Sequence, residues 1–206
     1  MAMIHRMQAT IGVVAGLALF AASPAAAQHY TDGYKFLQAV EKQDGAQVEA
    51  LLNKSSTVVN ARDLSDGHTA LHTAVKAHAY TMLSYLLGKG ADPNVADKKG
   101  VTPLMLASQT GFTDAVVALA RSGARVDEPS DTGETPLIMA VHARQLPMVR
   151  VLLAAGANPD REDDAGRSAR DYAKLQGADS LVLAEINRYD KNKSGRETQG
   201  TYGPSF

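Results

Sequence analysis

The histidines are the side chains of this sequence best suited to acid–base or metal chemistry. The chain has no cysteine, which excludes thiol nucleophiles, and it has no Gly-x-Ser-x-Gly or His-Glu-x-x-His pattern. The histidines that remain as candidates are His68, His72, His78 and His142. His78 and His142 do not form a His-x-x-x-His pair, so only the fold could bring them together at a metal. We therefore predict no catalytic residue, no metal site and no cofactor.

Two sets of glycines that share one spacing indicate what positions these side chains. Gly67, Gly100, Gly133 and Gly166 stand 33 residues apart. The pairs Gly90-Ala91, Gly123-Ala124 and Gly156-Ala157 keep the same step. A phosphate-binding loop would need a Gly-Lys-Ser/Thr ending, which is absent. A step shared by two independent sets indicates structural repeats.

The blocks that follow the first glycines have the composition of helix starts. Thr69, Thr102 and Thr135 can cap a helix, and Pro103 and Pro136 suit the first helical position. Each Gly-Ala pair suits the end of a second helix, where a left-handed residue closes the turn. These blocks, with Leu86-Leu87-x-x-Gly90-Ala91 and Leu152-Leu153-x-x-Gly156-Ala157, resemble the ankyrin repeat.

The resemblance implies an all-α solenoid of about five helix-turn-helix units with hairpin-like finger loops and a cap at each end. It also implies that His72 ties neighbouring loops together. We expect the repeat domain over residues 28–190, with units at approximately 34–65, 66–98, 99–131, 132–164 and 165–190.

The polar segment 191–206 is predicted to be a disordered tail. Its start, Asp190-Lys191-Asn192-Lys193-Ser194-Gly195, resembles the opening of an EF-hand loop. Thr201 stands where that loop needs a bidentate Glu, so we expect no ordered calcium site.

Residues 1–27 have the pattern of a cleaved secretory signal peptide. Arg6 precedes an apolar stretch from Ile11 to Ala22, and Ala25-Ala26-Ala27 suits cleavage before Gln28. The apolar stretch is too short for a membrane span. We expect a bacterial protein that is periplasmic or secreted and has no membrane attachment after cleavage.

The charge of the chain is close to neutral. The formal net charge is −1, and removal of Arg6 with the signal makes it −2. This balance argues against nucleic-acid binding. We expect a monomer whose partner is another protein.

By resemblance to ankyrin domains, the partner would bind in a groove between the fingers and the first helices. Finger residues Arg125 to Glu134 sum to −3, which favours a basic partner surface. The expected function is that of a scaffold, inhibitor or protective partner of an exported protein. The alternative is a small hydrolase or metal-handling protein whose site is dispersed over the repeats. The predicted partner-binding residues are Lys76, Asp97, Lys98, Lys99, Gln109, Asp127, Glu128, Asp131, His142, Asp160 and Arg161.

Overall fold

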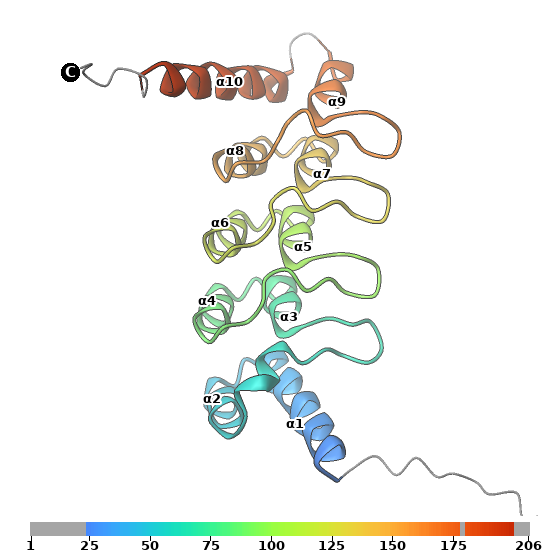
Figure 1. The fold of residues 1–206 in the computed structure, drawn as a ribbon, viewed down its shortest axis with the longest axis vertical. Coiled ribbons are helices and arrows are strands. Elements are labelled where there is room, and N and C mark those ends of the chain that lie inside the picture. The colour runs from blue at the N-terminus through green and yellow to red at the C-terminus, as the bar shows by residue number, and fades with distance from the viewer. Residues whose placement is uncertain (1–23, 178–179, 200–206) are drawn as a thin grey trace, which may run out of the picture.

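The computed structural model describes residues 24–177 and 180–199, which form a stack of paired helices (Figure 1). The first helices of the inner pairs form one column, the second helices form another, and loops project beyond the first column. The described part of the chain contains no named strand. The predicted all-helical solenoid is confirmed. The helices are α1 (Pro24–Glu41), α2 (Gly45–Lys54), α3 (Ala70–Lys76), α4 (Tyr80–Gly88), α5 (Pro103–Gln109), α6 (Thr113–Arg121), α7 (Pro136–His142), α8 (Leu146–Ala154), α9 (Ala169–Leu175) and α10 (Leu181–Gln199), with a short 3-10 helix at Ser56–Asn60.

The repeated hydroxyl residues start the first helices. The Thr102 hydroxyl accepts a hydrogen bond from the Met105 N–H, and Thr135 and Ser168 do the same in the next two units. The turns inside each pair need a left-handed residue. Gly111 supplies it between α5 and α6, whereas Arg144 adopts φ 53° at the corresponding turn between α7 and α8. The replacement of glycine at this junction therefore retains the turn at the cost of backbone strain.

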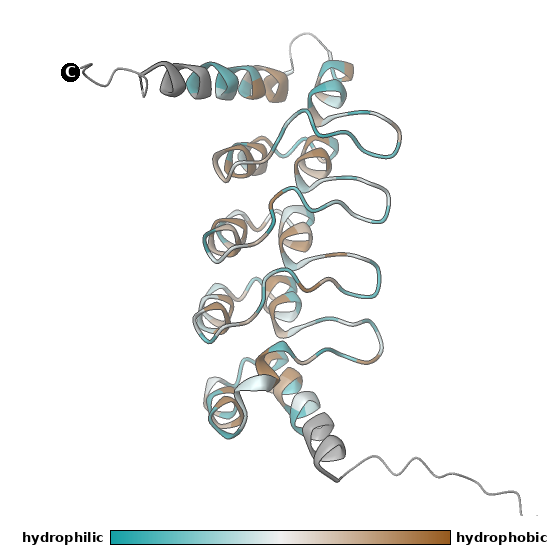
Figure 2. Ribbon diagram, viewed as in Figure 1, coloured by the Kyte–Doolittle hydropathy of each residue, from teal (hydrophilic) through white to brown (hydrophobic). Residues whose placement is uncertain are grey.

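Hydrophobic residues recur in both columns of helices (Figure 2), and leucines at equivalent positions form much of the core. Leu71, Leu104 and Leu137 of the first helices are at most 1% exposed. The second helices contribute a column of leucines at the same spacing, Leu86, Leu119 and Leu152, which are fully buried. Each unit buries its apolar face only against its neighbours, which is why the glycine spacing recurs along the whole array.

Four finger loops connect successive helix pairs: finger 1 (60–69), finger 2 (94–102), finger 3 (127–135) and finger 4 (160–168). Finger 1 is one residue longer than the others. Each finger folds back on itself, as in the antiparallel bridges Arg62–Thr69 and Glu162–Ser168. An Asp or Ser side chain closes most of these turns. The Asp97 carboxylate, for example, accepts hydrogen bonds from the backbone N–H groups of Lys99 and Val101.

The glycines of the fingers contact the next finger along the stack. A Cβ atom at Gly67 would lie 3.0 Å from the backbone nitrogen of Lys98, and one at Gly133 would lie 2.6 Å from that of Asp164. A Cβ at Gly100 would overlap the Asp131 carboxylate. Gly166, in the last finger, has no such neighbour. These glycines therefore set the spacing between fingers as well as the turn within each finger.

The ends of the array differ from the sequence-based expectation. Helix α10 continues through residues 191–199, which the sequence predicts to be disordered. The EF-hand-like residues 190–195 lie inside this helix rather than in a loop, and the Asp190 carboxylate pairs with Arg170 at 2.9 Å. Most of the predicted signal peptide, residues 1–23, lies outside the described residues, as do 200–206 of the predicted tail. Helix α1 begins at Pro24, within the last residues of that predicted segment.

Candidate protein-binding surface

The fingers and the C-terminal ends of the first helices together form one side of the stack, which we call the finger face (Figure 1). One row on it follows the repeat spacing. Lys76, Gln109, His142 and Leu175 occupy the same position at the ends of α3, α5, α7 and α9, and all four are exposed. Three of these residues are predicted binding residues. Leu175, which is 70% exposed, was not predicted, although its place in the same register could have indicated it.

The partly exposed Asp127 forms hydrogen bonds within the scaffold. Its carboxylate accepts hydrogen bonds from the Asn158 N–H at 3.0 and 3.2 Å. Asn60 and Asn94 hold the same position in the preceding units and accept hydrogen bonds from the N–H groups of Asp92 and Arg125. This ladder of side-chain to backbone bonds ties each unit to the next. Asp127 thus makes an internal contact, and its predicted contact with a partner stays a prediction.

Asp97 and Asp160 also form internal contacts. The side chain of Asp97 is only 6% exposed and lies 3.2 Å from His68 in addition to its backbone bonds. Asp160 occupies the position equivalent to Asp127 in the next unit. Among the described residues, no later finger offers it a backbone N–H like that of Asn158. Asp160 forms two bonds with the Arg170 guanidinium instead, at 2.6 and 3.0 Å. The hydrogen bond with Asp160 raises the pKa of Arg170, which stays fully charged. The Asp160 side chain is still 60% exposed, and the predicted partner contacts of both acids stay predictions.

The remaining predicted residues lie on the finger face and differ in their internal contacts and in their exposure. Lys98 uses its backbone N–H to bind the Asp66 carbonyl and its ammonium to bind the Leu64 carbonyl, so it joins fingers 1 and 2. Glu128 pairs with Arg125 at 3.3 Å and keeps a side chain that is 35% exposed. Asp131 at the end of finger 3, Lys99 beside Lys98 and Arg161 of finger 4 are exposed. Lys76, on the helix end nearby, is likewise an exposed charge.

His78 and His142 each pack against an aromatic ring. His78 stacks on Phe112 at 4.6 Å, whereas His142 packs edge-on against Tyr172 at 4.2 Å and lies 3.1 Å from Glu134. Within residues 24–177 and 180–199, no group of three or more His, Asp or Glu side chains could hold a metal ion. The two histidines of the alternative hypothesis therefore contact different aromatic rings and do not share a site.

His72 has the linking role that the sequence predicts for it. Its Nδ1 accepts a hydrogen bond from the Thr69 N–H at 3.1 Å, and its Nε2 donates to the Val101 carbonyl of finger 2 at 2.9 Å. These two bonds require the neutral ring with the proton on Nε2. His68 stacks on this ring with 5.1 Å between centroids. The four-residue spacing from His68 to His72 could have indicated this pair.

Stability is expected to fall as the pH falls from 7 to 5. Burial lowers the pKa of the His72 imidazole below its ordinary value of about 6.5, and its bond to Val101 offsets only part of this effect. Between the folded and unfolded pKa values the unfolded chain binds the extra proton, so acid favours unfolding. Urea unfolding followed by circular dichroism should give a lower midpoint at pH 5 than at pH 7. An unchanged midpoint would contradict this assignment.

A second loss of stability is expected below pH 4, from Asp63 and Asp163 of the fingers and Asp171 of α9. The hydrogen bond from Ser65 lowers the pKa of Asp63, the bond from Tyr172 lowers that of Asp163, and the bond from Ser168 lowers that of Asp171 to about 2. Stability from these carboxylates is present above their unfolded pKa and is lost as the pH falls through the folded value. The same urea series extended to pH 3 should show a second, steeper fall in the midpoint.

No helix in the described part of the chain is both long and apolar enough to cross a membrane. This finding includes α10, which has 19 residues and a polar C-terminal half.

Comparison with known proteins places the repeats in a family. A family model described as ankyrin repeats (3 copies) matches residues 17–97 and 80–163. The probable E3 ubiquitin-protein ligase XBOS31 of Oryza sativa subsp. japonica is 36% identical over 96 residues, which are 47% of this chain and 22% of that protein. Glycerophosphocholine phosphodiesterase gde1 of Schizosaccharomyces pombe is 46% identical over 65 residues, 31% of this chain and 6% of that protein. The 2-5A-dependent ribonuclease of Mus musculus is 38% identical over 76 residues, 37% of this chain and 10% of that protein.

This chain spans less than a quarter of the length of each of these relatives, whose names describe different activities. The family model matches more than half of the residues of this chain. The chain therefore belongs to the ankyrin repeat family.

Proposed function

We propose that this chain is a monomeric protein-interaction module that docks on one partner through the finger face, as a scaffold, inhibitor or protective partner of an exported protein. Ankyrin repeats are protein–protein interaction modules. One observation carries the proposal, namely the exposed row of Lys76, Gln109, His142 and Leu175. These positions are equivalent in the scaffold, yet they present an ammonium, an amide, an imidazole and a leucine side chain. The repeated scaffold thus offers a row of different groups to one partner surface, as specific recognition requires.

The partner surface that faces finger 3 is proposed to be basic. Asp127 contacts the neighbouring unit, but Glu128, Asp131 and Glu134 remain at least partly exposed. Glu134 lies beside His142, so the acidic finger joins the exposed row. Complementary charge at such a rim raises the association rate and excludes partners of the same sign.

Export is supported by the sequence of residues 1–27, with Arg6, an apolar stretch and a small-residue cleavage site. Cleavage after Ala27 would shorten α1 but would leave the buried residues Asp32, Phe36, Ala39 and Val40 in place. The repeat stack is therefore compatible with such processing. The intact mass of protein purified from a bacterial periplasm tests this part of the proposal. A mass that includes residues 1–27 would overturn it.

Charge reversal on finger 3 tests the docking proposal. We expect Glu128→Lys with Asp131→Lys to weaken binding of the natural partner about tenfold, a difference of about 1.4 kcal/mol. The immobilised protein would first capture partners from the exported fraction of the source cells. The dissociation constant of each purified candidate would then be measured for the wild type and the variant.

The matched control places the same charge change on the second helices. Glu49→Lys with Asp114→Lys alters two exposed acids of α2 and α6, away from the fingers. We expect this variant to bind within about twofold of the wild type, because screening weakens distant charges. Equal losses for both double variants would show that net charge, rather than finger 3, governs binding. Undiminished binding by the finger variant would refute the docking site.

A further inference from the structure

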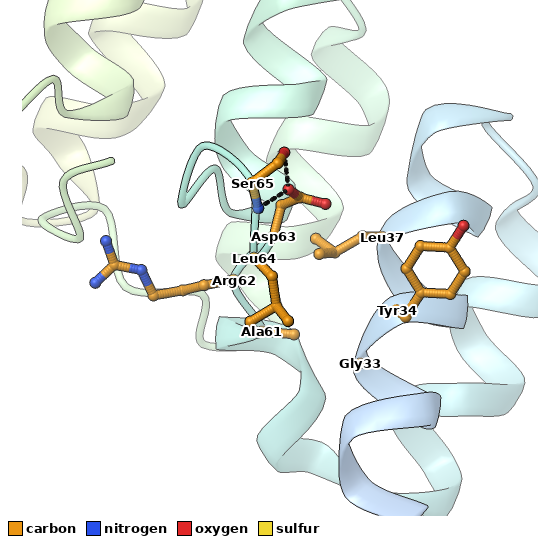
Figure 3. A pocket seen from close by; sticks show the side chains of 8 residues that line it. All are labelled: Gly33, Tyr34, Leu37, Ala61, Arg62, Asp63, Leu64 and Ser65. Carbon is orange, nitrogen blue, oxygen red and sulfur yellow. Dashed lines mark hydrogen bonds between the residues drawn. The ribbon is translucent and has the colours of Figure 1, made fainter. Parts of the chain in front are cut away.

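Two adjoining hollows lie at the N-terminal end of the finger face. One, of about 410 Å³, lies between α1 and finger 1, and the other, of about 540 Å³, continues from it toward the end of α3. They share Tyr34, Leu37, Asp63 and Ser65, so they form one continuous depression, which we call the N-terminal hollow. In Figure 3, Leu37 extends from α1 toward the finger, whereas Arg62 extends away from α1.

The position of finger 1 at the end of the array explains the hollow. The tips of fingers 2, 3 and 4 carry Lys98, Asp131 and Asp164, each close to a glycine of the preceding finger. Leu64 follows Asp63 as Lys98 follows Asp97, but no finger precedes finger 1 in the described structure. Leu64 consequently remains 64% exposed.

The chemistry of the hollow differs from that of the other finger tips. Where those tips are charged, finger 1 presents a leucine, and Tyr34 across the hollow is 53% exposed. These are two of the five large hydrophobic side chains that are exposed among the described residues. Leu37 and Ala61 add apolar surface between them. Large apolar side chains that gather at one concave place mark an interaction site more often than scattered ones do.

The rim of the hollow is acidic. Glu41, Asp63 and Asp66 line it, against the ammonium of Lys76 and the guanidinium of Arg62, which donates to the Ala96 carbonyl of finger 2. The Asp66 carboxylate lies 2.9 Å from the Nδ1 of His68. Glu41 is exposed at the end of α1, where its carboxylate can meet a partner. An apolar floor beside an acidic rim matches a segment that combines an apolar side chain with a neighbouring positive charge.

We propose that the N-terminal hollow binds a short segment of a partner protein in which a large apolar side chain stands next to a lysine or arginine. The apolar side chain packs between Leu64, Tyr34 and Leu37, and the basic side chain pairs with Glu41. This inference deepens the proposed function and rests on it, because it identifies where on the finger face a partner is anchored and by what chemistry.

The test uses a defined probe, a phage-displayed library of random 12-residue peptides selected against the purified protein. Selected peptides should share an apolar–basic pair of residues. Their affinities would be measured by fluorescence polarisation for the wild type, Leu64→Ser and Glu41→Lys. We expect each variant to weaken binding about tenfold, because truncation of a central anchor has effects of this size. Circular dichroism would verify that each variant folds, as expected for changes at exposed side chains.

Matched controls make the same changes elsewhere. Leu181→Ser alters a leucine that is 70% exposed at the start of α10, and Glu49→Lys alters an exposed acid on α2. Both controls should bind within about twofold of the wild type. Failure to enrich any peptide, or enrichment of peptides that ignore Leu64→Ser and Glu41→Lys, would overturn the inference.

Two further results would overturn this inference and leave the proposed function unaffected. Peptides that lose affinity with Asp131→Lys but not with Leu64→Ser would place the anchor at finger 3. A wild-type dimer that becomes monomeric in Leu64→Ser, as measured by sedimentation, would show that a second copy of the chain fills the hollow. The proposed function fails separately, if charge reversal on finger 3 leaves the affinity of the natural partner unchanged.

Discussion

Replacement of Gly133 with alanine is expected to lower the free energy of unfolding by about 3 kcal/mol. Two costs contribute to this loss. The residue adopts φ 75°, where a side chain costs about 1–2 kcal/mol. The added Cβ would also lie 2.6 Å from the backbone nitrogen of Asp164, so finger 4 must move. Overpacking of this kind typically costs about 1–3 kcal/mol.

Gly123→Ala separates the two costs. Gly123 has a similar φ of 88°, but a Cβ there would meet no atom within 4 Å. We expect this variant to lose only the backbone contribution of about 1–2 kcal/mol. Urea unfolding of both variants, analysed with a common slope, measures the difference. If the two variants are equally destabilised, the contact between fingers 3 and 4 has no energetic role.

His72→Ala is expected to cost about 3 kcal/mol, because the change leaves a cavity and removes two hydrogen bonds. The His72 side chain is fully buried. It satisfies the Thr69 N–H at the start of α3 and at the same time binds the Val101 carbonyl in finger 2. The variant should therefore weaken the junction between two units as well as one helix end. Amide hydrogen exchange should show faster opening around both Thr69 and Val101.

His78→Ala serves as the control for this prediction. His78 is exposed and its ring contact is with Phe112. Its loss should cost about 1 kcal/mol or less, the range of an aromatic contact. His72→Ala should also lose the decrease in unfolding midpoint between pH 7 and pH 5, whereas His78→Ala should retain it. A pH dependence that survives in His72→Ala would assign the titration to another group.

The helix starts and turns of the fold could be predicted because each depends on residues close together in the sequence. Thr102 and Thr135 cap helices, and the Gly-Ala pairs follow the second helices, as their local patterns indicate. Local patterns are less informative at the position of His72, which is occupied by different residues in the other repeats. Met105 places its sulfur 3.4 Å from the Thr102 N–H, and Asp171 binds Ser168, so dissimilar side chains partly replace the imidazole.

The binding surface was harder to predict, because a charged residue in a loop can point either outward or toward the next unit. Asp127 binds Asn158, which lies 31 residues further along the chain. Nothing in the residues adjacent to Asp127 reveals that contact. The register does, since Asn60 and Asn94 at the equivalent positions are also suited to binding backbone groups. Residues 191–199 continue α10, although their polar composition favours disorder, because helix formation depends on backbone hydrogen bonds that composition does not report.

The Arg170 contacts with Asp160 and Asp190 also determine how an array of this kind can change in length. At the last unit, the acid that elsewhere reaches forward to a following repeat is bound by an arginine that also holds α10. A repeat added after this unit would find the Asp160 carboxylate already bound to Arg170. It would also find α10 packed where the new repeat would have to dock. Duplication of an inner 33-residue segment would preserve every junction. Gain or loss of repeats is thus compatible with the middle of the stack, whereas the Arg170 contacts oppose insertion of a repeat between α9 and α10.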